Sequence, residues 1–225
     1  MTGITGVTWH HDYVVNGVPY PLRNRLDWPH DEINDRMLGF TDEESRTSTA
    51  VHELGHGVVW LAAGVHVLYL GVGIGPGGQA ACASVTQSPQ ERLARVIGTV
   101  AGERAVDRWL RETGRWTPEH AAMAELGAWQ DRAYVFACDP QPRPGFGDGE
   151  IDYSVLHDLA DQALSASWDN ILAALPVLLR AGRMTGDQLA ACTGLPNTPP
   201  RERHVNLRSE LVAAQPSGTE LRPRP

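Results

Sequence analysis

The sequence predicts a mainly α-helical fold with a small β-sheet, in the α+β class. Three observations lead to this prediction. Segments with apolar residues at three- and four-residue spacing begin at N-terminal capping signals and occupy most of residues 41–193. Two short segments rich in β-branched and small residues, 65–74 and 79–86, follow the first of these helices. Hydrophobic residues make up 42% of the 225-residue chain, which is enough for a substantial core.

Residues 1–40 are predicted to form an N-terminal extension with a small β-hairpin. Asn16-Gly17 lies between two apolar runs, which is typical of a type I′ turn because both turn residues need positive φ. At the other end, the composition changes to Pro, Arg and Ser, which predicts a disordered tail over 195–225. The segment 41–194 between them is expected to be the folded domain.

The first helix of this domain is predicted to begin at Thr41. Thr41 and Glu44 fit a capping box, in which each side chain accepts a hydrogen bond from the backbone N–H of the other residue. Gly64 is placed to end the helix, because glycine readily adopts the left-handed conformation that follows a C-cap. Apolar residues recur on one face between these ends, at Val51, Leu54, Val58 and Leu61.

The remaining elements are predicted from similar signals. Strands over 65–74 and 79–86 flank a Gly-Pro-Gly-Gly turn. A second capping box with proline at the first helical position, Ser88-Pro89-Gln90-Glu91, begins a helix that runs to about Gly114. Further helices are predicted at 117–137, with a break near Gly127, at 152–181 and at 185–193, and residues 139–150 are predicted to form a loop.

The charged residues exclude several classes of function. The chain has 19 basic and 27 acidic side chains, a net charge of −8, and every basic residue is arginine. The absence of lysine excludes a Schiff-base mechanism and a Walker A phosphate loop. The acidic balance argues against nucleic acid as a partner, because neutralising phosphates requires a basic surface.

The cysteines and the hydropathy pattern predict a cytoplasmic protein without a membrane span. Cys82, Cys138 and Cys192 are odd in number and form no CxxC pair, so neither a disulfide framework nor a thiolate zinc site is indicated. The first residues lack the basic and apolar regions of a signal peptide. Residues 57–75 carry no formal charge, but five glycines interrupt them, which fits a helix end followed by a strand.

The sequence His52-Glu53-Leu54-Gly55-His56 matches the HExxH pattern inside the best-supported helix. Residues at i and i+4 lie one turn apart on the same helix face, so both imidazoles can bind one zinc ion. Glu53 lies about 100° around the helix from His52 and is expected to be the general base. Zinc would activate a water molecule, from which Glu53 takes a proton during attack on a peptide carbonyl.

A catalytic zinc site needs a third protein ligand, and HExxH supplies only two. Spacing alone does not choose among the carboxylates and the histidine downstream. The candidates are Glu91, Glu103, His120, Glu125 and Asp131. Glu91 has a weaker claim because the capping box already explains it.

The segment 49–193 resembles the peptidase domain of FtsH-type zinc metalloproteases, a family with a zincin-like HExxH helix followed by strands and a C-terminal helical bundle. The residues 49–59, TAVHELGHGVV, are similar to the family's helix around HEAGH, and the residues 101–107, AGERAVD, are similar to its AGRAAE helix. The residues 168–189 resemble its C-terminal helices. Only HExxH is a specific motif among these similarities.

The resemblance implies an aspartate as the third zinc ligand, on a helix after the AGRAAE-like segment. Asp131 in GAWQDRA is the best match, and Glu125 is the alternative because the alanine spacing after Asp131 differs from the family pattern. The family also carries an ATPase module and a membrane anchor, which this chain is expected to lack. Peptides or flexible protein segments, rather than folded proteins, are therefore the expected substrates.

The sequence is also compatible with other functions. HELGH followed by a glycine-rich segment is also similar to site-2-type intramembrane proteases, but the polar residues TDEESRTST begin the helix and no LDG motif occurs. A non-catalytic zinc-binding adaptor or sensor would keep the same metal ligands. A zinc hydrolase of non-peptide amides would use the same chemistry. The sequence gives no indication of the oligomeric state.

Overall fold

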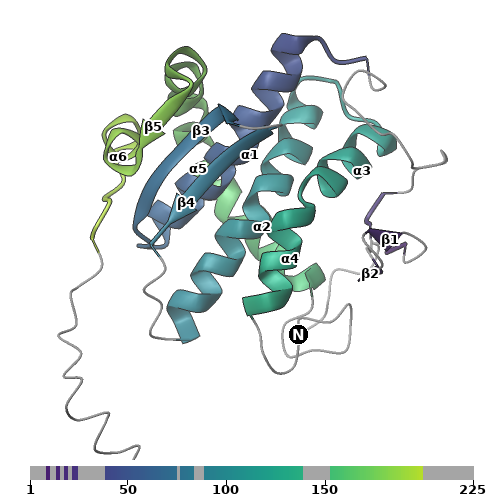
Figure 1. The fold of residues 1–225 in the computed structure, drawn as a ribbon, viewed down its shortest axis with the longest axis horizontal. Helices are drawn as coiled ribbons and strands as arrows, with labels where there is room; N and C mark the ends of the chain where they lie inside the picture. Colours follow the sequence, from purple (N-terminus) through teal and green to yellow (C-terminus); the bar gives the residue numbers. More distant parts are fainter. Residues whose placement is uncertain are drawn as a thin grey trace, which may run out of the picture.

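A computed structural model gives the fold of the chain (Figure 1). It describes residues 9–10, 14–15, 18–19, 22–24, 39–74, 77–83, 89–138 and 153–199. Within these ranges the protein is mainly helical and contains a small three-stranded antiparallel sheet, which confirms the predicted α+β class. No helix in this part of the chain combines the length and the apolar character that crossing a membrane requires.

The core of the molecule is built around helix α1 (Asp42–Ala62). As Figure 1 shows, the sheet lies along one side of α1, and helices α2 (Pro89–Glu112) and α5 (Tyr153–Ala181) pack against its other sides. The predicted capping box is present, since Glu44 N–H donates to Thr41 Oγ1 and Thr41 N–H donates to Glu44 Oε2. Gly64 follows the C-cap with a φ of 76°, as predicted.

The sheet has the strand order β4-β3-β5 and is antiparallel throughout. It consists of β3 (Val67–Ile74), β4 (Gly77–Cys82) and β5 (Arg183–Thr185). The predicted four-residue turn was too long, because Gly77 and Gly78 already pair with β3. Strand β5 was not predicted, because its three residues are too few to show a period. Residues 84–86 of the second predicted strand lie outside the described residues.

The later helices agree with the prediction. Helix α3 (Pro118–Gly127) and helix α4 (Trp129–Cys138) replace the predicted 117–137 segment, with the break at Ala128. Helix α6 (Gly186–Thr193) follows β5 directly. The Asn197 side chain then hydrogen-bonds to both the N–H and the C=O of Val67, which fixes the chain after α6 against β3. The predicted loop at 139–150 lies outside the described residues. Of the tail predicted to be disordered, 195–225, the structure describes 195–199 as ordered up to the Asn197 contacts, and 200–225 lie outside the described residues.

Part of the N-terminal extension is described. Strands β1 (Val14–Val15) and β2 (Val18–Pro19) pair with Val15 opposite Val18, the register that a two-residue hairpin turn requires. The turn residues 16–17 themselves lie outside the described residues. Leu22 is fully buried and pairs with His10, so this segment contributes to the folded core.

Candidate metal centre

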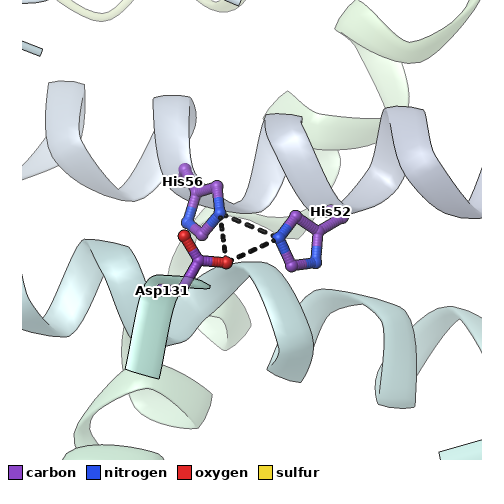
Figure 2. A group of neighbouring side chains, drawn as sticks. All are labelled: His52, His56 and Asp131. Atoms are coloured by element: carbon purple, nitrogen blue, oxygen red, sulfur yellow. Dashed lines mark hydrogen bonds and ion pairs between the residues drawn. The ribbon is translucent and has the colours of Figure 1, made fainter. Parts of the chain in front are cut away.

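Three side chains from two helices converge on one point. Figure 2 shows His52 and His56 on α1 facing Asp131 on α4. Asp131 Oδ2 lies 3.0 Å from His52 Nε2 and 3.4 Å from His56 Nε2, and the two Nε2 atoms are 3.0 Å apart. Among the described residues, these three side chains form a group whose ligand atoms are close enough to share a metal ion.

The separations between these atoms fit a zinc ion. In a tetrahedral zinc site with bonds of about 2.0–2.2 Å, two ligand atoms lie about 3.4 Å apart. The observed separations of 3.0 to 3.4 Å are close to those on one face of such a tetrahedron. The His56 side chain is almost fully buried, whereas those of His52 and Asp131 are 17% and 30% exposed, which leaves a solvent-facing side for a further ligand.

Helix α2 holds the two histidines in place. The Gly98 carbonyl accepts a hydrogen bond of 2.9 Å from His56 Nδ1, which leaves Nε2 for the metal, as the outer hydrogen bond of a zinc-binding histidine normally does. Gly102 leaves room for the rings, because a Cβ there would lie 2.3 Å from His56 Cε1 and 2.8 Å from His52 Nε2. A Cβ on Gly55 would likewise lie 2.6 Å from the carbonyl oxygen of Ala101, so α1 and α2 pack closely.

Glu53 is buried beside the edge strand β4. Only 5% of its surface is exposed, and a Cβ on Gly78 of β4 would lie 2.5 Å from Glu53 Oε1. Burial raises the pKa of its carboxyl group, although the neighbouring imidazoles of His52 and His56 act in the opposite direction. Glu53 is thus a buried carboxyl on the position of α1 that directly follows His52.

The charges of Asp131 and the two histidines stabilise one another. Burial lowers the pKa of His56, but the Asp131 carboxylate outweighs this effect and raises it to about 9. Burial raises the pKa of Asp131, but the His56 and His52 imidazoles outweigh that effect and hold it well below its usual range. Asp131 is therefore ionised at neutral pH, the form that a carboxylate ligand needs, whereas a metal ion would have to displace a proton from His56.

The other candidate ligands have different partners. Glu103 and Glu125 both pair with the buried guanidinium of Arg132, at 2.9 and 3.2 Å. The ring of His120 contacts the Arg115 carbonyl at 2.5 Å through Nδ1, and the side chain of Glu91 lies on the exposed surface. The structure therefore brings Asp131, and not one of these four, to the two histidines.

Sequence reasoning missed the residues that support the site. Gly98 and Gly102 lie one turn apart on α2, and small residues at this spacing are a signal for close helix packing that could have been recognised. Arg132 gave no such signal, because its partners are distant in sequence. No family model matches the chain, and no curated protein sequence matches it. The resemblance to the FtsH-type peptidase domain therefore rests on the residues quoted above.

Proposed function

We propose that the protein is a zinc-dependent metallopeptidase that works without ATP. His52, His56 and Asp131 would hold the zinc ion, and Glu53 would be the general base. The observation that carries the proposal is the convergence of His52 Nε2, His56 Nε2 and Asp131 Oδ2 within 3.4 Å of one another, with Glu53 buried on the next position of α1. Three protein ligands with one open side are typical of catalytic zinc sites.

A bound zinc ion would supply Lewis acidity, polarising the scissile carbonyl and lowering the pKa of water. The chain's own residues supply the rest of the chemistry. Glu53 takes a proton from the attacking water and delivers it to the amine that leaves when the C–N bond breaks. Asp131 contributes a negative charge to the ligand set, and the Gly98 carbonyl keeps the His56 ring in the orientation that presents Nε2.

The expected substrates are peptides or flexible protein segments. Strand β4 is an edge strand of the sheet, and its Gly78 lies directly against Glu53. An extended peptide could add to this edge by backbone hydrogen bonds, which would bring a peptide bond next to the general base. A cytoplasmic location is part of the proposal, and the free thiols of Cys82 and Cys192, which fit a reducing compartment, support it.

The test combines metal analysis with hydrolysis of a fluorogenic library of unstructured peptides. Glu53→Gln should keep one zinc per chain and lose activity by about 10²- to 10⁴-fold, the usual contribution of a general base. Glu43→Gln is the matched control, because Glu43 lies in the exposed first turn of the same helix. It should retain both zinc and activity.

Two results would overturn the proposal. A wild-type protein that binds no zinc would remove the metal site altogether. A zinc-loaded wild type that hydrolyses no peptide, or an unchanged rate for Glu53→Gln, would remove the peptidase activity. Small amides assayed in parallel distinguish a peptidase from an amide hydrolase with the same metal ligands.

A further inference from the structure

A buried cluster of charged side chains adjoins the candidate metal centre, because its Arg132 follows Asp131 on α4 and its Glu103 follows Gly102 on α2. Its centre is Arg132, which is fully buried, and Glu103 and Glu125 are 1% and 2% exposed. Arg132 Nε donates to Glu103 Oε2 at 2.9 Å, and Arg132 Nη2 donates to Glu125 Oε2 at 3.2 Å. Breaking a buried ion pair costs several kcal/mol, so such a cluster resists rearrangement.

The cluster joins four parts of the chain. Glu103 comes from α2, Glu125 from α3 and Arg132 from α4. From α5, the hydroxyl of Tyr153 donates to Glu103 Oε1 at 3.0 Å, and the guanidinium of Arg132 lies 4.9 Å from the centre of the Tyr153 ring. His157, also on α5, approaches Glu103 Oε1 to 2.5 Å through Nε2.

Residues of the N-terminal extension contact this cluster. The backbone N–H of Arg23 donates to Glu125 Oε2 at 2.7 Å, and Asn24 Nδ2 donates to Glu125 Oε1 at 2.8 Å. Trp9 packs edge-on against Tyr153 and His157, with ring centres 6.2 and 5.1 Å apart. The extension therefore supplies hydrogen bonds that the buried Glu125 carboxylate would otherwise lack.

Over residues 129–135, helix α4 is held by few buried side chains, and the ring of Tyr134 there lies 5.8 Å from the guanidinium of Arg95. Between residues 129 and 135, the buried side chains are those of Arg132 and Val135, and Asp131 is half-buried. A ten-residue helix has little stability of its own, so tertiary contacts decide where it lies. Consecutive side chains on a helix differ by about 100° in direction. Fixing Arg132 in the core therefore fixes the direction of Asp131.

We propose that Arg132 is a positioning residue, which sets the rotation of α4 and thereby holds the Asp131 carboxylate beside His52 and His56. The inference rests on the proposed zinc site and deepens it. A rotation of α4 by only 20° would move a carboxylate group by roughly 2 Å, which is the length of a zinc–oxygen bond. The salt bridges of Arg132 thus serve the metal site in addition to the stability of the fold.

The molecule offers a matched control for this proposal. Arg104 is also a buried arginine, 7% exposed, and it also binds two carboxylates. It donates to Asp161 at 2.8 and 3.0 Å and to Asp107 at 3.2 Å. Arg104 lies on α2 and is not adjacent in sequence to His52, His56 or Asp131. A loss of buried ion pairing at Arg104 should therefore lower stability without moving Asp131.

The experiment compares Arg132→Lys with Arg104→Lys in the full-length protein. Lysine keeps the positive charge, so both variants are expected to fold. Its single ammonium group cannot reproduce the fixed geometry in which a planar guanidinium pairs with two carboxylates. Zinc affinity is measured by competition with a chromophoric chelator, and the visible absorption of the cobalt(II)-substituted protein reports the geometry of the ligands. Thermal unfolding of the metal-free proteins gives the change in stability.

Arg132→Lys is expected to lower zinc affinity by about 10- to 100-fold, as outer-shell changes usually do, and to alter the cobalt spectrum. Arg104→Lys should keep both. If the loss of affinity in Arg132→Lys is less than threefold greater than that in Arg104→Lys, the inference is wrong. A wild type that does not bind zinc would instead contradict the proposed function, so the two failures are distinguishable.

Discussion

The two sides of the candidate metal centre are held by different kinds of interaction. His52 and His56 lie on one long helix, and the close packing of α1 against the small residues of α2 limits where their rings can go. Asp131 lies on a short helix, whose place depends on the buried salt bridges of Arg132. The histidine side is therefore sensitive to added volume, and the aspartate side is sensitive to lost charge and lost hydrogen bonds.

The largest effect is expected from adding one methyl group on the histidine side. In Gly102→Ala the new Cβ would lie 2.3 Å from His56 Cε1 and 2.6 Å from His56 Nε2, so the ring must move. Zinc affinity should fall by at least about 100-fold, in line with the 1–3 kcal/mol cost of overpacking together with the loss of ligand geometry. The chelator competition assay measures it.

Gly127→Ala is the control for this substitution. A Cβ at Gly127 would meet no atom within 4 Å. This variant should bind zinc as the wild type does and be slightly more stable, because alanine favours the helix over glycine by about 1 kcal/mol. Equal zinc affinity in the two alanine variants would show that Gly102 does not shape the site.

On the aspartate side, changing Glu125 should alter the way in which the free energy of unfolding depends on pH. Burial and the Glu103 carboxylate raise the pKa of Glu125 to about 7, against the lowering effect of Arg132. The folded state therefore binds the Glu125 proton more tightly than the unfolded state. Stability contributed by this group is lost as the pH rises from about 4.5 to 7.

His157 changes stability in the opposite direction. Burial, which outweighs the attraction of Glu103, lowers the pKa of His157 to about 4, so stability from this group is lost as the pH falls from about 6.5 to 4. The two effects offset each other in the wild type. Glu125→Gln removes one of them, so between pH 5 and 7 the metal-free variant should gain up to about 2 kcal/mol relative to the wild type. Urea unfolding at a series of pH values measures this difference. If the free energies of unfolding of the wild type and the variant differ by the same amount at every pH, the raised pKa assigned to Glu125 is contradicted.

A smaller loss of stability is expected for Tyr153→Phe. The change keeps the ring against Arg132 and removes only the hydroxyl that donates to Glu103. A hydrogen bond to a charged group contributes about 1.5–3 kcal/mol, and Glu103 retains Arg132 and His157, so we expect the lower value. For a chain of this size that corresponds to a fall of about 3–6 °C in Tm.

The matched variant Tyr69→Phe tests whether this effect is specific to the cluster. Tyr69 lies on β3, where it contacts Arg183 through its ring. Scanning calorimetry should show little change for it. If Tyr153→Phe and Tyr69→Phe melt at the same temperature, the Glu103 hydrogen bond does not stabilise the fold.

The smallest effect is expected at the outer end of the cluster. Asn24→Ala removes one of the donors to Glu125 and leaves those from Arg23 and Arg132 in place. The loss should be about 1 kcal/mol, because solvent near this half-buried side chain can replace the bond in part. Zinc affinity should fall by less than in Arg132→Lys. A larger fall than in Arg132→Lys would show that the extension, and not the arginine, controls α4.

The two sides also differ in how far the sequence could predict them. Helix α1 was predictable because its signals are local: the capping box at Thr41, the glycine at position 64 and HExxH all lie within one helix. Spacing could not identify a third candidate ligand, because it left five residues, and Asp131 was expected only from the resemblance to a known family. The contacts of Arg132 join residues up to 29 positions apart, and no local pattern encodes them.

The sheet also contains strands that could be predicted from local sequence and one that could not. Strands β3 and β4 were predicted because each is long enough to show β-branched or small residues between turns. Strand β5 exists because Met184 pairs with Leu70 of β3, and its three residues carry no pattern of their own. Tertiary pairing, rather than local preference, decides elements of this length.

We propose that His52, His56 and Asp131 bind one zinc ion together. The most direct measurement is anomalous diffraction at the zinc absorption edge, from crystals of the full-length protein grown with zinc. A peak is predicted within about 2.2 Å of His52 Nε2, His56 Nε2 and an Asp131 carboxylate oxygen. The absence of a peak between the two histidines, or a peak bonded to them and to a different third side chain, would contradict the account.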